Sequence, residues 1–153
     1  MAKHEHVTFS SGRDLIEHGI RYLTWTRDAL DELRERDHEQ RVRMLLESVE
    51  VEQRNLLGSL ERLLEDTSRK ALNTYTQYSV ELPTEVVLPD EPLTTLGLVK
   101  WLQEYNNHLQ EMFAKLAENE DSEEASNVFG GIAQQIEAHD RRLSKEYQRT
   151  EDL

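Results

Sequence analysis

Two segments with the same residue pattern carry the side chains of this sequence that could do chemistry. The first reads VEVEQRNL at Val49–Leu56, and the second reads IEAHDRRL at Ile136–Leu143. In each segment a polar residue stands within an apolar stripe of helical spacing, Glu52 in the first and His139 in the second. A carboxylate and an imidazole at matched places in a helical bundle could ligate a metal ion, transfer a proton, or form a buried polar pair. The sequence leaves these three interpretations open.

The polar pair is the interpretation that requires the fewest additional residues. Such a pair can fix the register and topology of a bundle, whereas a metal site needs further ligands. Glu50 and Glu137 lie one position beyond the apolar stripe in the two segments. We expect both at the surface, paired with Arg54 and Arg141 one helical turn later.

Four stretches with apolar residues at spacings of three and four predict four amphipathic helices. They cover roughly residues 11–36, 39–70, 91–118 and 122–149. Their expected N-terminal capping residues are Ser10 or Ser11 for the first helix, Asp90 (with Pro92 in the first turn) for the third, and Asp121 or Ser122 for the fourth.

The lengths of the connections predict how these helices are arranged. Short junctions follow the first and third helices, so each should form an antiparallel hairpin with its successor. Between the hairpins, roughly residues 71–90 lose the helical stripe and include Pro83 and Pro89. A connection of this length can run back along the bundle. The predicted fold is therefore all-α, a single four-helix-bundle domain (1–153) made of two hairpins joined by a long crossover.

Composition excludes several classes of function. The chain of 153 residues has a formal net charge of −13, which disfavours nucleic-acid binding. No apolar run approaches the roughly 18 residues of a membrane span, and the first residues lack a secretory signal pattern. No cysteine is present, which excludes thiolate metal sites and disulfides. We expect a cytoplasmic protein that binds neither nucleic acid nor membrane.

The chain resembles the ferritin-like superfamily, and within it the rubrerythrin-type branch. The segment FGGIAQQIEAHDRRL at Phe129–Leu143, which follows an acidic turn, carries most of the resemblance. In that family an apolar stripe at this place leads into Glu-x-x-His. Helices two and four of the family each supply Glu-x-x-His, helices one and three each supply a Glu, and together they hold two metal ions. The resemblance implies a bundle with one crossover and iron or another divalent metal as cofactor.

The ligand set of this sequence departs from the family pattern. His139 matches the family histidine of helix four, but Ile136 stands where the family has Glu, and Val49 stands at the matched position of helix two. A register moved by one residue pairs Glu50 with Gln53 and Glu137 with Asp140, and neither register gives a complete ligand set. A dinuclear centre needs about six convergent oxygen or nitrogen donors. The candidate metal ligands that remain are Glu17, Glu52 and His139, together with Glu104, Asn106 or His108 from the third helix.

These observations lead to three functional hypotheses. The first is a ferritin-like bundle with an incomplete di-metal site that acts through binding or assembly, and is not an enzyme. The alternative is a metal-binding redox or iron-handling protein that uses a reduced site around Glu52 and His139. In either case a homodimer is expected, because bundles of this class commonly pair. The third hypothesis is a plain interaction module in which the crossover, Trp25 and Trp101 form the dimer face. The alternative for the two tryptophans is that they pack under the crossover.

Overall fold

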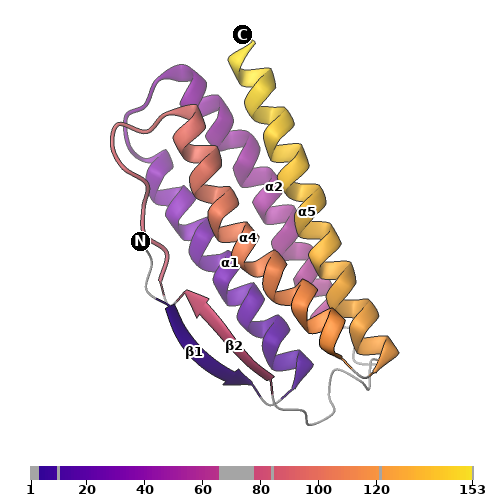
Figure 1. Ribbon diagram of the computed structural model, residues 1–153. Helices are drawn as coiled ribbons and strands as arrows, with labels where there is room; N and C mark the ends of the chain where they lie inside the picture. The colour runs from indigo at the N-terminus through magenta and orange to yellow at the C-terminus, as the bar shows by residue number, and fades with distance from the viewer. Residues whose placement is uncertain (1–3, 10, 66–77, 84, 121, 153) are drawn as a thin grey trace.

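Four helices account for most of the chain in the computed structural model, which describes residues 4–9, 11–65, 78–83, 85–120 and 122–152. They are α1 (Gly12–Arg34), α2 (Gln40–Glu65), α4 (Thr95–Asn119) and α5 (Glu123–Glu151). The predicted all-α class with four helices is confirmed (Figure 1). The sequence predicted no strands, yet two short ones are present, β1 (His4–Phe9) and β2 (Tyr78–Pro83). They pair antiparallel, with Val7 opposite Val80.

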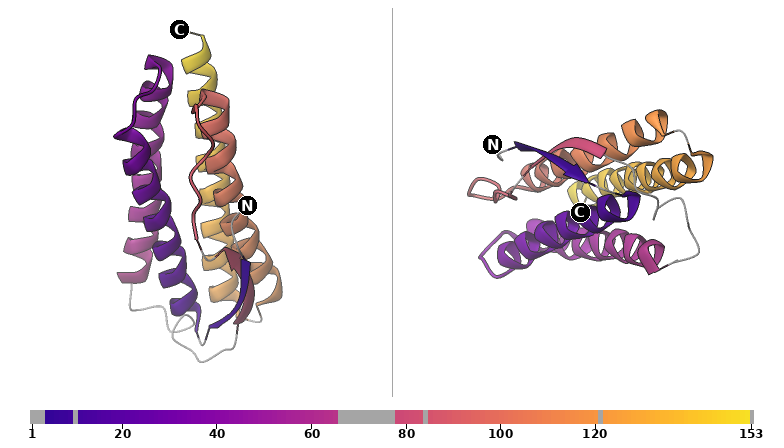
Figure 2. Two further views of the ribbon diagram at one scale, coloured as in Figure 1. Left: turned by 90° about the vertical axis from the view of Figure 1, so that its left-hand side faces the viewer. Right: turned by 90° about the horizontal axis from the view of Figure 1, so that it is seen from below.

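The helices form two layers of two. Helices α1 and α2 lie side by side in one layer, and α4 and α5 lie side by side in the other (Figure 2). Figure 1 shows α1 and α5 running in one direction and α2 and α4 in the other. Because α2 and α4 run the same way, the chain must return along the bundle between them. Residues 85–94 follow that path, and the two-stranded sheet lies beside α1 (Figure 1).

Local capping explains where the helices start. The Ser11 side chain caps α1 by accepting a hydrogen bond from the Asp14 amide at 3.2 Å, and Ser122 caps α5 through the Ala125 amide at 3.3 Å. The predicted start of α4 was wrong by four residues. Thr94, not Asp90, is the cap, and its hydroxyl accepts from the Gly97 amide at 2.9 Å. The last predicted turn of α2, residues 66–70, lies outside the described residues.

The crossover is held on α4 by two aromatic side chains that bind one residue. The Trp101 indole donates to the Val87 carbonyl at 2.6 Å, and the Tyr105 hydroxyl accepts from the Val87 amide at 2.7 Å. The Tyr22 hydroxyl on α1 donates to the Tyr105 carbonyl at 2.9 Å, which links the two layers. Trp101 is therefore buried under the crossover and does not form part of an exposed face.

The core between the layers is almost entirely aliphatic and aromatic, with Leu15, Leu45, Leu102 and Phe129 among its fully buried members. Burial of this apolar surface is the main force that holds the four helices together. Among the helices described, none is both long enough and apolar enough to cross a membrane.

Candidate functional site

A layer of polar side chains crosses the apolar core, and every helix contributes to it. Its buried members are Thr26 from α1, Gln53 from α2, Asn106 from α4 and His139 from α5, each exposed by 1% or less. Each stands within the apolar stripe of its own helix, so helical periodicity turns it toward the bundle interior. Buried polar groups need hydrogen-bond partners, and these residues find them in one another.

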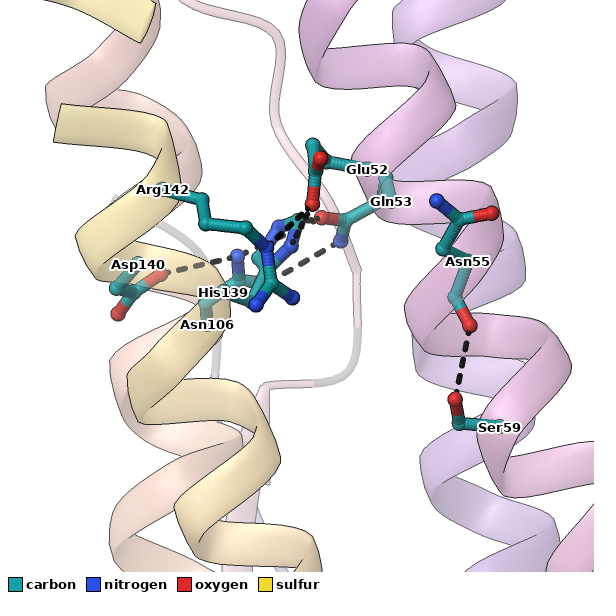
Figure 3. Close-up of polar contacts among 8 residues, drawn as sticks. All are labelled: Glu52, Gln53, Asn55, Ser59, Asn106, His139, Asp140 and Arg142. Atoms are coloured by element: carbon teal, nitrogen blue, oxygen red, sulfur yellow. Dashed lines mark hydrogen bonds and ion pairs between the residues drawn. The ribbon is translucent and has the colours of Figure 1, made fainter. Parts of the chain in front are cut away.

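Gln53 is the centre of this layer (Figure 3). Its side-chain nitrogen Nε2 donates to the Thr26 hydroxyl at 3.0 Å and to the side-chain oxygen Oδ1 of Asn106 at 3.2 Å. Its carbonyl oxygen lies 2.9 Å from Nε2 of His139. The Thr26 hydroxyl in turn donates to the Leu23 carbonyl at 2.8 Å. One side chain of α2 thus connects all three other helices.

His139 is a neutral imidazole with a defined tautomer. The Gln53 carbonyl oxygen can only accept, so Nε2 of His139 carries the hydrogen and Nδ1 does not. Burial lowers the pKa of His139 to about 4, although the Glu52 carboxylate acts in the opposite direction. The ring is therefore uncharged at neutral pH. Its Nδ1 makes no hydrogen bond and lies 3.7 Å from a Glu52 oxygen.

Glu52 and His139 do meet across the α2–α5 interface, but Arg142 is the stronger partner of Glu52. The Arg142 Nε donates to Glu52 Oε2 at 2.8 Å (Figure 3). The Glu52 side chain is 24% exposed, so the carboxylate lies at the edge of the core. A guanidinium thus supplies the positive charge beside this carboxylate.

Asp140 extends the polar layer toward the opposite edge. It accepts a hydrogen bond from the Asn106 amide at 3.3 Å (Figure 3). Burial raises the pKa of Asp140 to about 6, and the bond from Asn106 partly opposes that shift. Asp140 thus ends the hydrogen-bonded chain that runs from His139 through Gln53 and Asn106. Glu52 lies beside the other end, 3.7 Å from Nδ1 of His139 and without a hydrogen bond to it.

The structure brings together only two of the three predicted metal ligands. Glu17 is exposed on α1, about two and a half helical turns before Thr26, and is not part of the polar layer. Of the third-helix candidates, Asn106 is in the layer and Glu104 is exposed. Within the described part of the chain, no group of three or more His, Asp or Glu side chains is placed to hold a metal ion.

The residues present do not fit a dinuclear centre of the ferritin-like type. Val49 and Ile136, which the sequence resemblance aligns with the family's carboxylates, are both completely buried aliphatic residues. The side-chain oxygen of Asn106 accepts a hydrogen bond from Gln53, and the side-chain oxygen of Gln53 accepts one from His139. Both oxygens would have to give up these bonds to bind a metal ion. Chemically, the layer pairs its own donors and acceptors, with Nδ1 of His139 left without a hydrogen bond.

One of the two predicted surface ion pairs is present and the other is not. Glu137 and Arg141 are exposed and 3.1 Å apart. Glu50, in contrast, is only 5% exposed and bonds to Arg34 of α1 rather than to Arg54. Burial raises the pKa of Glu50, the Asp31 carboxyl raises it further, and Arg34 opposes both effects. The predicted pair with Arg54 does not form because Glu50 faces the α1–α2 interface.

Sequence reasoning identified His139 and Glu52 but gave too little weight to Thr26, Gln53 and Arg142. A signal was present for the first two, since each is a polar residue within a predicted apolar stripe. No comparable signal existed for Arg142, because its role depends on which helix lies beside α5.

Comparison with protein-family models, with curated proteins and with solved structures finds no match to this chain.

Proposed function

We propose that the protein is a ferritin-like bundle that acts by binding or assembly and not by metal chemistry. The observation that carries this proposal is the closed polar layer of Thr26, Gln53, Asn106 and His139 at mid-bundle. A dinuclear centre needs carboxylates that point inward and are free to coordinate. Here amide and hydroxyl groups fill that volume and bind one another.

The order of the helices supports the ferritin-like part of the proposal. Two pairs of neighbouring helices, with α2 and α4 running in the same direction, require a connection that returns along the bundle (Figure 1). This is the topology of a four-helix bundle with one crossover. The crossover is held on α4 by hydrogen bonds to the Val87 backbone, as expected of a connection that forms part of the folded structure.

Metal titration tests the proposal. The purified, untagged chain should show no stoichiometric tight binding of Fe(II), Mn(II) or Zn(II) by calorimetry, and elemental analysis should find no metal at stoichiometric level. Binding of two ions per chain with retained helicity would overturn the proposal.

The alternative function, metal handling at a reduced site, is favoured by one specific observation. The unprotonated Nδ1 of His139 makes no hydrogen bond and faces the Glu52 carboxylate at 3.7 Å. Imidazole nitrogen and carboxylate oxygen are both good ligands for Zn²⁺ and Fe²⁺. Two protein ligands are fewer than structural or catalytic sites generally use, which is why this function ranks second.

Three variants separate the two functions. If the alternative holds, Glu52→Gln and His139→Gln each lose metal uptake. In that case Arg142→Ala strengthens it, because the competing guanidinium is gone. Arg141→Ala is the matched control, since Arg141 pairs with exposed Glu137 on the same helix. If the closed layer is structural, none of the four variants changes metal binding, and only stability responds.

A further inference from the structure

The outer surface of α2 carries a row of residues with the spacing of a helix–helix seam. Positions that alternate in steps of four and three form one row on a helix and are the pattern of a coiled-coil contact. On α2 the row consists of Met44, Ser48, Val51, Asn55, Gly58 and Arg62. We refer to these six residues as the α2 seam. All six are half-buried or exposed, so the seam lies outside the core of its own chain.

The chemistry of the α2 seam differs from that of the surface around it. Charged residues make up 32% of the chain, but the first five seam residues are uncharged. Val51 is 51% exposed, the highest value among the exposed large hydrophobic residues described. Interfaces are depleted in charged residues at their centre, and a −13 chain can approach a second copy most readily through an uncharged surface.

Among the described residues, none packs closely enough against Gly58 to require a glycine there. Of the atoms in the described part of the chain, a Cβ built on Gly58 would meet the Arg62 Nη1, at 3.3 Å, which is the movable end of a flexible side chain. Glycine weakens a helix relative to alanine. A small residue on an outer helix surface does, however, leave a notch into which a side chain of a neighbouring helix can fit.

We infer that the α2 seam is the contact between two copies of this chain, which pair α2 against α2 in antiparallel orientation. With the two-fold axis between Arg54 and Asn55, Val51 of each copy lies opposite Gly58 of the other. The same register places Arg62 opposite Glu47, an exposed carboxylate, so the only charge of the seam meets an opposite charge. An isologous contact of this kind is self-complementary, as a two-fold dimer requires.

The size of the available surface is sufficient for a dimer. From Met44 to Arg62 the seam runs about 27 Å along the helix axis. Beside it a groove of about 370 Å³ separates α2 from α5, lined in part by the uncharged residues Ser59, Asn127, Gly131 and Gln135. Seam and groove together cover two helix widths, or roughly 500 Å² per copy, which reaches the total of about 1,000 Å² expected for a specific contact.

This inference rests on the proposed function, because it names the partner with which the bundle assembles. The two can fail separately. A monomeric chain that binds no metal would overturn the α2 seam and leave the metal-free bundle intact. A dimeric chain that binds two metal ions would overturn the metal-free bundle and leave the α2 seam intact.

Sedimentation velocity of the full chain over a wide concentration range tests the seam. The unmodified protein should be a dimer, and Val51→Glu should raise the dimer dissociation constant about tenfold or more. Its circular dichroism should not change, because the Val51 side chain is exposed. Val87→Glu, at an exposed valine of the crossover, is the matched control and should remain dimeric. A monomer at all concentrations, or a dimer that Val51→Glu leaves unchanged, would overturn the inference.

A charge swap tests the register directly. Arg62→Glu should weaken the dimer by placing two carboxylates opposite each other, and Glu47→Arg should weaken it by placing two cations there. The double variant should recover the original affinity, because it restores the pair in reversed order. Failure of the double variant to recover would contradict the antiparallel register.

Because the chain has no cysteine, single introduced cysteines report proximity without interference. Asn55→Cys lies next to the two-fold axis and should give an intermolecular disulfide on mild oxidation. Val87→Cys should not. Equal cross-linking of both variants, or of neither, would contradict the proposed contact.

Discussion

Hydrogen bonding rather than charge determines the chemistry of the polar layer at the level of single residues. The imidazole of His139 is neutral, and Gln53, Thr26 and Asn106 are uncharged. An ionised group in this position would need a counter-charge in a medium of low dielectric constant. Charge is confined to the two edges, where Glu52 is paired with Arg142 and Asp140 is half-buried. The layer links the four helices through hydrogen bonds between uncharged side chains.

Replacement of Gln53 by Ala should be strongly destabilising. The substitution leaves Nε2 of His139 without an acceptor and removes the donor that Thr26 and Asn106 share. It also opens a cavity in the core, and each unsatisfied buried polar group costs about 1–3 kcal/mol. We expect a loss of about 3 kcal/mol or more in the free energy of unfolding. Urea denaturation followed by circular dichroism measures it. Gln134→Ala, at an exposed glutamine of α5, is the control and should change stability little.

His139 and Asp140 should give opposite pH dependences of stability. The pKa of His139 falls from 6.5 to about 4 on folding, so the unfolded chain binds more protons between these values. The stability that it contributes is present above pH 6.5 and is lost as the pH falls. The pKa of Asp140 rises from 3.8 to about 6. Its contribution is present below pH 3.8 and is lost as the pH rises through 6.

Two variants isolate these opposing effects. Between pH 4 and 6 they partly cancel in the unmodified protein. Relative to it, Asp140→Asn should lose stability on acidification, because only the His139 effect remains. His139→Gln, which can still donate to Gln53, should gain stability over the same interval. Urea unfolding at several pH values measures both. Parallel pH profiles for the two variants would contradict the assignment.

At the scale of elements, the crossover is held by specific hydrogen bonds as well as by apolar packing. Trp101 and Tyr105 lie one turn apart on α4, and both bind the backbone of Val87. These bonds hold the returning chain against α4. The helix starts are likewise set by single hydroxyl caps at Ser11, Thr94 and Ser122.

Tyr105→Phe should loosen the crossover without disturbing the helices. It removes the hydroxyl that accepts from the Val87 amide but keeps the Tyr105 carbonyl that binds Tyr22. We expect a stability loss of about 1 kcal/mol and faster hydrogen exchange at the Val87 amide. Tyr22→Phe is the matched comparison, because it removes the bond between layers and leaves the Val87 amide protected. Slow exchange at Val87 in Tyr105→Phe would show that the hydroxyl does not hold the crossover.

At the scale of the whole molecule, the net charge of −13 limits how the bundle can associate. Acidic surfaces of two copies repel, and the repulsion extends over about 10 Å at moderate ionic strength. The α2 seam is a surface along which two copies could meet, because its first five residues are uncharged. Assembly through that surface is compatible with an otherwise strongly acidic protein, whereas a face that includes Trp101 is not available because Trp101 is buried.

Within the described part of the chain, the sequence by itself determined the four helices, their approximate extents and the residues of their apolar stripes. These follow from periodicity, capping and proline, all of which act over a few residues. The same local signals could not predict the two strands, because the pairing of β1 with β2 joins residues such as Val7 and Val80 that are far apart in the chain. They also placed the start of α4 at Asp90, since Asp90 and Thr94 are both acceptable caps and only one is used.

Only the tertiary structure decided what the polar residues do. Glu52 and His139 were predicted to face each other, and they lie 3.7 Å apart, but the bonds they make go to Arg142 and Gln53. Which partner is reached depends on the axial register of α2 against α5 and on the rotation of both helices. Those quantities are set by the packing of the entire core, not by the spacing of residues along one helix.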